Sequence, residues 1–209
     1  SGKFERGMTL RSSSGKSFNV HNPMMFMAQE REIAMEAFPG DVIGIPNHGG
    51  LRVGDSLSET GDVAFKGIPN FAPEILKRVR VKDPLKQKHL RKALESLGEE
   101  GVTQVFKPVL GGDLVIGAVG ALQFDVLNER MKAEYDLEVI FEQSPYQAAR
   151  WVSADKRTDL EAFTEKSASQ MAEDVDGAPV YLGKSAWEIG YVQDKNPNVR
   201  FSGVKERVV

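Results

Sequence analysis

The spacing of apolar residues changes character after residue 60. Before it, the apolar runs are short, and glycine, proline and serine separate them. Short runs closed by regular turns predict an antiparallel β-barrel or sandwich. Residues 61–74 contain two prolines and two glycines and show no helical period, so a domain boundary is predicted between residues 64 and 65.

From residue 74 onward, patterns typical of strands and helices alternate. Asp83 is a favourable N-cap, and the proline after it is tolerated at the first helical position. Gly111 and Gly112 supply the positive φ angles of a two-residue hairpin turn. The pattern predicts, in chain order, a strand at 74–82, a helix after residue 83, hairpin strands at Thr103–Leu110 and Asp113–Ala118, a helix at 121–135 and a strand at Leu137–Phe141. This β-α-β-β-α-β order is ferredoxin-like.

The remaining residues predict a different arrangement. Two capping boxes, which begin at Thr158 and at Ser185, open two further helices. Around these helices the pattern predicts three strands, at Ala148–Ala154, Val180–Leu182 and Val199–Phe201. We therefore expect a C-terminal β-α-β-α-β extension, and we find no internal sequence repeat.

The predicted fold class is α+β, with two domains. A partial antiparallel β-barrel is expected over residues 1–64, and a ferredoxin-like α+β domain with its extension over residues 65–209. The barrel has too few strands to close, and the first residue is serine rather than methionine. We therefore expect the chain to be a C-terminal fragment of a longer protein.

The helix predicted at 121–135 has two apolar stripes instead of the single stripe of an ordinary surface helix. The first stripe consists of Phe124, Leu127, Met131 and Tyr135. The second, formed by Leu122, Val126 and Ala133, lies nearly opposite. The second stripe predicts either a neighbouring element of the same domain or a surface that docks on another domain. The residues proposed for docking are those of the first stripe and its edge, namely Gln123, Phe124, Leu127 and Met131.

Composition excludes several classes of protein. With 41% hydrophobic and 27% charged residues, the chain has the composition of a globular protein that can form a packed core. The absence of cysteine excludes disulfides and thiolate zinc sites. No apolar run approaches the roughly 18 residues of a membrane span, and no signal peptide is visible. The net charge of −3 argues against a nucleic-acid binder that works by bulk charge.

One segment, residues 77–92, is strongly basic, with eight Lys or Arg residues against one Asp. It is either a solvated face balanced by Glu95, Glu99 and Glu100, or a patch that contacts RNA phosphates or an acidic protein. The candidate contact residues are Arg78, Arg80, Lys86, Lys88, Arg91 and Lys92.

The sequence contains no recognisable active site. Gly15-Lys16-Ser17 resembles the end of a phosphate-binding loop, but position 10 is Leu instead of Gly, and a hairpin turn is the expected structure. The three histidines lie far apart and have no partner at metal-ligand spacing. We therefore predict no catalytic residue, metal site or cofactor site in this chain. A free-standing α+β enzyme with an unrecognised site is the remaining alternative.

Two sets of motifs resemble the translational GTPases. Gly40-Asp41-Val42 and Gly54-Asp55-Ser56-Leu57 resemble marks of their β-barrel domain, and Gly117 and Gly120 fit a signature of the domain that follows. Within that group, Ile68–Phe106 and Gly120–Leu127 resemble the family of bacterial peptide chain release factor 3, the class II termination GTPases.

This resemblance implies a function for the intact protein. Members of the family bind the ribosome and, in the GTP state, promote departure of the class I release factor after peptide release. The implied partners are small-subunit RNA, a ribosomal protein, the class I factor and the protein's own GTP-binding domain, with no membrane and a cytoplasmic location. GTP and Mg²⁺ would bind in the N-terminal domain, outside this chain, so this fragment would not be an enzyme. An elongation or ribosome-protection factor is the alternative, although residues 82–88 and Gln123-Phe124-Asp125 favour termination.

Overall fold

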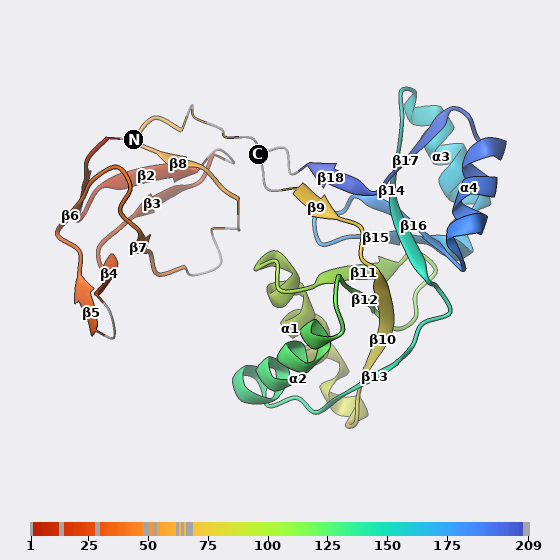
Figure 1. The fold of residues 1–209 in the computed structure, drawn as a ribbon, viewed down its shortest axis with the longest axis horizontal. Helices are drawn as coiled ribbons and strands as arrows, with labels where there is room; N and C mark the ends of the chain where they lie inside the picture. Colours follow the sequence, from red (N-terminus) through yellow and green to blue (C-terminus); the bar gives the residue numbers. More distant parts are fainter. Residues whose placement is uncertain are drawn as a thin grey trace. The chain divides into compact units, whose positions relative to one another are not determined.

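A computed structural model of the chain describes residues 2–12, 15–27, 30–47, 51, 54–61, 63, 65 and 69–206. The chain divides into two compact units, one extending to Ile68 and the other comprising Pro69–Lys205 (Figure 1). This division falls close to the boundary that the sequence predicts between residues 64 and 65.

The first unit consists of short antiparallel strands, in agreement with the turn-rich sequence. The strands are β1 (Phe4–Glu5), β2 (Thr9–Ser12), β3 (Ser17–Asn19), β4 (Met24–Met27), β5 (Glu30–Ile33), β6 (Glu36–Ala37), β7 (Ile43–Gly44) and β8 (Leu57–Ser58). They form three small sheets, in the orders β1-β6, β3-β2-β8 and β5-β4-β7. This is the partial β-barrel architecture that the sequence predicts.

The second unit is a mixed α+β structure built on one eight-stranded sheet. It opens with β9 (Pro69–Phe71), β10 (Ile75–Val81), the 3₁₀ turn η1 (Pro84–Lys86), α1 (Gln87–Glu99), β11 (Gln104–Pro108), β12 (Val115–Ala118), α2 (Leu122–Tyr135) and β13 (Val139–Gln143). It continues with β14 (Ala148–Ala154), α3 (Arg157–Lys166), η2 (Ala168–Gln170), β15 (Met171–Glu173), β16 (Pro179–Gly183), α4 (Ala186–Lys195), β17 (Val199–Ser202) and β18 (Val204–Glu206). The order in the large sheet is β13-β10-β12-β11-β15-β16-β14-β17, and β18 pairs with β9.

The first half of this sheet, which we call the first module (residues 75–143), confirms the ferredoxin-like prediction. Its elements follow one another as β10-α1-β11-β12-α2-β13. The strands pair antiparallel in the spatial order β13-β10-β12-β11, so the first strand lies in the interior of the sheet. Asp83 caps η1 as predicted, because its Oδ1 accepts a hydrogen bond of 3.0 Å from the N–H of Leu85.

The second module (residues 148–202) corrects the predicted extension. The structure adds β15, so the order is β14-α3-β15-β16-α4-β17 instead of β-α-β-α-β. With β15 included, the spatial order β15-β16-β14-β17 repeats that of the first module, read from the opposite edge. The chain therefore contains two modules of the same topology. β15 escapes prediction because it is only three residues long, too short to show a period.

The modules join edge to edge between β11 and β15. Lys107 lies opposite Glu173 and Pro108 opposite Ala172 in an antiparallel pair. The prediction of a two-residue hairpin turn is wrong, because β11 separates from β12 after Phe106 and pairs with β15 instead. Gly111 and Gly112 have the predicted positive φ angles, but they lie within a longer connection.

Three hydrophobic cores hold the second unit together. One lies between the first sheet half and helices α1 and α2, and includes Val79, Leu94 and Leu127. Another lies between the second sheet half and helices α3 and α4, and includes Phe163 and Tyr181. The third joins the helix-free faces of the two halves, with residues such as Leu76 and Trp151. Within this unit the helices therefore lie on the outer faces of the sheet (Figure 1).

Candidate functional surfaces

The six basic residues predicted as one patch are divided between opposite faces of the sheet. Val79 is fully buried in the core beneath α1. Since successive side chains of a strand point to opposite faces, Arg78 and Arg80 point away from α1. Lys88, Arg91 and Lys92 lie on α1 itself and are exposed. A single anion-binding patch is therefore excluded, and the prediction needs correction.

Arg78 and Arg80, the two arginines of β10, form ion pairs within the first module. Arg80 lies 2.7 Å from Asp113 and 3.5 Å from Glu142, and Glu142 also lies 3.5 Å from Arg78. The hydrogen bond from Arg80 to Asp113 raises the pKa of this guanidinium above its usual range. These contacts give Arg78 and Arg80 a structural role that limits their ability to bind an outside anion.

Lys86 is likewise engaged, at the end of η1. Its Nζ lies 2.8 Å from Oδ2 of Asp136, and it donates a second hydrogen bond to the carbonyl oxygen of the same residue. This contact lowers the pKa of Asp136 and raises the pKa of Lys86. Asp136 adopts a left-handed φ of 52° at the end of α2, so Lys86 ties the start of α1 to the end of α2.

The three cations of α1 form the remaining basic surface, which we call the α1 cationic face (Lys88, Arg91 and Lys92). Within the described residues none of the three forms an ion pair with a carboxylate. Glu100, which could have balanced them, pairs with Arg130 at 2.9 Å. Lys88, in the first turn of α1, also opposes the helix dipole, because cations are favourable near the C-terminus of a helix, and Arg91 and Lys92 lie beyond that turn, where the dipole has little effect. A favourable interaction with the helix dipole therefore does not explain the three cations.

The residues predicted to dock through α2 have structural roles, which corrects that assignment. Phe124, Leu127 and Met131 are at most 3% exposed and belong to the core between α2 and the sheet. Gln123 holds the segment just before the helix, since its Oε1 accepts hydrogen bonds from the N–H groups of Val119 and Gly120. None of the four presents its side chain for docking in the way we predicted.

The opposite stripe of α2 is the exposed one. Leu122 is 77% exposed and Val126 is 54% exposed, and Val119 just before the helix is 53% exposed. We call these three residues the α2 aliphatic stripe. The sequence contains both stripes, but it does not show which faces the sheet. An exposed aliphatic cluster of this kind is typical of a surface that contacts another protein.

The described residues contain no cluster arranged to bind a metal ion. No group of three His, Asp or Glu residues is arranged to hold a metal ion there. Lys16 and Ser17 follow the turn between β2 and β3, whereas a phosphate-binding loop leads from a strand into a helix. No helix in the described part of the chain is long and apolar enough to span a membrane.

Comparisons with known proteins agree with this architecture. The family model for the class II release factor RF3 C-terminal domain matches residues 65–193, and the model for elongation factor G domain 2 matches residues 1–60. A crystal structure of a protein from Thermus thermophilus is similar, with 25% identity and a TM-score of 0.56. The match covers 74% of this chain and 24% of that protein, so the chain spans about a quarter of its length.

The two family matches divide the chain as the structure does. The first covers most of the unit that begins at Pro69, and the second covers most of the strands before Ile68. Because the RF3 model alone covers more than half of the chain, the comparison establishes the family. The chain belongs to the family of class II release factor RF3 C-terminal domains, preceded by a domain like domain 2 of elongation factor G.

Proposed function

We propose that this chain is the ribosome-binding part of a translation-termination GTPase. In this proposal the intact factor, in its GTP state, promotes departure of a class I release factor from the ribosome after peptide release. The observation that supports the proposal most strongly is the family match over residues 65–193. The factor would act in the cytoplasm on small-subunit RNA and a ribosomal protein.

GTP and Mg²⁺ belong, in this proposal, to a separate domain of the intact factor. Gly15-Lys16-Ser17 is the stretch of this chain that most resembles a phosphate-binding loop. Its Lys16 N–H donates to Oγ of Ser12, and Ser17 begins a strand that pairs with β2. A loop that cradles phosphates needs backbone N–H groups that open onto the ligand at the start of a helix. This chain would therefore contribute binding and positioning, and no hydrolysis.

The α1 cationic face is our candidate for RNA contact. Each of the three cations is exposed and lies on the outer side of α1. Lys88 opposes the helix dipole at a cost of roughly 0.3–1 kcal/mol, and Arg91 and Lys92 lie beyond the first turn and gain nothing from it, so interaction with the dipole does not account for these cations. Phosphate contact does, because each cation that meets a phosphate releases condensed counterions from the RNA.

The α2 aliphatic stripe is our candidate for protein contact. Leu122 and Val126 offer no charge to a phosphate and no ring to a base. Both side chains expose apolar area to water. A protein surface that covered this area would gain about 25 cal/mol of binding free energy for each Å² buried. We assign the stripe to the factor's own GTP-binding domain, one of the partners that the resemblance implies.

Co-sedimentation with 70S ribosomes tests the proposal. Wild-type chain should bind saturably, and binding should weaken as salt is raised. Changing Lys88, Arg91 and Lys92 to Gln should weaken binding roughly 10-fold or more and lower the salt slope by about two. The matched control carries the same loss of charge at three exposed lysines elsewhere, Lys107, Lys132 and Lys156. Equal effects of the two triple variants would remove α1 from the proposal.

An elongation-type role is the second candidate, because residues 1–60 match elongation factor G domain 2. The intact factor separates the two roles. A termination factor should accelerate loss of a labelled class I release factor from ribosomes after peptide release and leave translocation unchanged. Faster translocation without faster loss of the release factor would favour the second role.

A further inference from the structure

The outer face of α4 carries two stacked aromatic rings that no core covers. Trp187 is 77% exposed and Tyr191 is 51% exposed. Their ring centroids lie 5.6 Å apart with an angle of 14° between the ring planes. Nζ of Lys195 lies 5.7 Å from the centroid of the Tyr191 ring. Large aromatic side chains usually contribute their area to a core or an interface, so two parallel rings left in solvent indicate a binding surface.

The helix holds these rings in a fixed position. Trp187, Tyr191 and Lys195 follow one another at intervals of four residues, so they lie along one side of α4. On the other side, Ile189 is buried, and it packs so closely against Gly183 that a Cβ there would lie 2.7 Å away. The hydroxyl of Ser185 caps the helix by accepting from the N–H of Glu188. The stacked pair is therefore carried on a firmly anchored helix.

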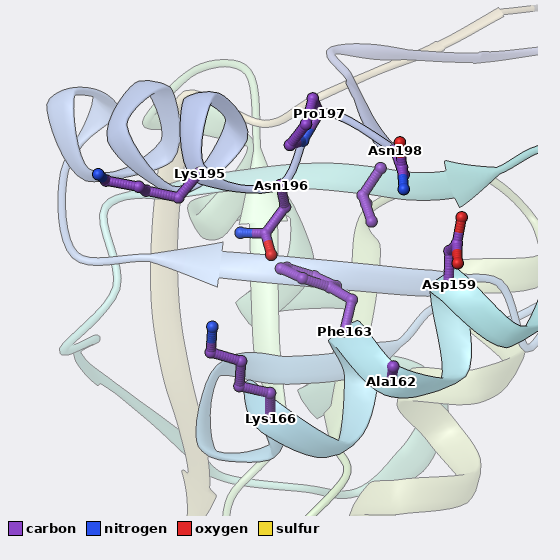
Figure 2. A pocket seen from close by; sticks show the side chains of 9 residues that line it. Asp159, Ala162, Phe163, Lys166, Lys195, Asn196, Pro197 and Asn198 are labelled. Carbon is purple, nitrogen blue, oxygen red and sulfur yellow. The ribbon is translucent and has the colours of Figure 1, made fainter.

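The surroundings of the pair are cationic and amide-rich. Next to the end of α4 is a hollow of about 260 Å³ to which α3 contributes Lys166 and α4 contributes Lys195 (Figure 2). Asn196 and Asn198 line the same hollow. Lys184, also exposed, lies just before α4. None of these three lysines forms an ion pair within the described residues.

The nearby carboxylates are mostly engaged. Glu188 accepts hydrogen bonds from the N–H of Lys184 and from Gln170, and Glu161 pairs with Arg157. Asp159 lines the hollow, and Asp194 is exposed on α4. These last two negative charges would repel an anion. Substitution of Asp194 therefore tests whether the ligand is negatively charged.

We propose that Trp187 and Tyr191 form a stacking platform for an unpaired base of single-stranded RNA, with Lys166, Lys184 and Lys195 beside its phosphates. The inference rests on the proposed ribosome-binding function, which supplies the RNA. Stacking on aromatic side chains, combined with lysines along the backbone, is how proteins bind single strands without reading sequence. A protein-docking surface would add aliphatic side chains, as the α2 aliphatic stripe does, whereas the side chain beside the α4 pair is that of Lys195, which also lines the hollow with Lys166 and two asparagines.

The two tryptophans make the test direct. Trp151 is 8% exposed and donates to Asp174, so Trp187 is the tryptophan that a ligand can reach. A single-stranded RNA octamer should quench the Trp187 emission saturably, and the same sequence in a duplex should not. In anisotropy with a labelled octamer, Trp187→Leu should weaken binding roughly 5- to 100-fold, as expected for loss of one base stack. Trp187→Phe retains a ring and should stay within about threefold, and Asp194→Asn should strengthen binding.

Ribosome co-sedimentation of the same variants separates this inference from the proposed function. Quenching by the octamer without ribosome binding would support the platform and contradict the proposed function. Ribosome binding without quenching, together with equal octamer affinity of wild type and Trp187→Leu, would overturn the platform and leave the proposed function standing. A photo-crosslinker at position 187 that reacts with ribosomal protein instead of RNA would also overturn it.

Discussion

Nζ of Lys205 lies 2.6 Å from Oδ2 of Asp174, and this ion pair fastens β18 to the second module. Asp174 is 9% exposed at its side chain and accepts a hydrogen bond from Nε1 of Trp151 through the same oxygen. Its other oxygen accepts from the N–H groups of Asp176 and Ala178. One carboxylate thus holds a strand, a core tryptophan and a turn.

We expect Asp174→Ala to destabilise the protein by roughly 2–4 kcal/mol. The substitution leaves the Trp151 N–H and two backbone N–H groups without their acceptor in a site with little water. Asp174→Asn keeps the acceptor for the turn and should cost less. Urea unfolding measures both. Asp155→Ala is the control, because its pair with Arg200 is solvent-exposed and should contribute almost nothing. Equal effects at positions 174 and 155 would contradict this account.

Acid should weaken the end of α2 in a defined direction. The hydrogen bond from Lys86 lowers the pKa of Asp136 in the folded state, and Arg130 does the same for Glu134. A lowered folded pKa means that the unfolded state binds more protons as the pH falls. The stabilisation is therefore complete above the unfolded pKa, near 4, and disappears as the pH falls through the folded value.

Asp136→Asn isolates this contribution. Asn tolerates the left-handed φ of 52° while it lacks the charge, so backbone strain is not introduced. The free energy of unfolding, measured between pH 7 and pH 2.5, should fall less steeply in the variant than in the wild type. Because the pair is exposed, 1 M salt should shrink the difference. Parallel pH profiles at low salt would contradict the assigned role of Lys86.

Local signals predict the first module well. The spacing of Leu90, Leu94 and Leu97 gives α1 one apolar face, and all three are fully buried. The second module is harder, because β15 is a three-residue strand that acquires its structure by pairing with β11 and β16. The same long-range pairing overrides the glycine turn at Gly111–Gly112. The local sequence pattern does not show which strand pairs with each edge strand of the two modules.

The candidate surfaces show the same limit. Arg80 and Arg91 belong to one basic run in the sequence, yet a strand and a helix carry them to different faces. Asp113 and Glu142, which neutralise Arg80, come from distant segments. A run of charge therefore predicts a patch only when its residues share one element. The stacked rings of α4 could have been noticed from their spacing of four residues, but their exposure could not.

The two stripes of α2 should respond oppositely to truncation. Leu127→Ala should cost about 2–5 kcal/mol, because it removes packing from a side chain that is 1% exposed in the core. Leu122→Ala should change stability by less than about 0.5 kcal/mol, since the side chain is in solvent. Urea unfolding of the two variants checks the assignment. A larger effect at Leu122 would mean that the stripes are exchanged and that the proposed docking surface is wrong.

Gly117 and Gly120, the two glycines of the family signature, should differ as sharply in the stability that they lose when replaced by alanine. A Cβ at Gly117 would lie 2.5 Å from Cγ of Pro73 and 3.1 Å from Cε2 of Phe106, both held firmly in the packed interior of the unit. We expect Gly117→Ala to cost roughly 1–3 kcal/mol by overpacking, visible as a lower thermal midpoint. Gly120 is the matched control, because a Cβ there meets nothing within 4 Å and its φ is not positive. Gly120→Ala should stay within about 0.5 kcal/mol of wild type. If both substitutions were equally harmful, close packing would not explain Gly117, and the signature would have to be explained by contacts outside this chain.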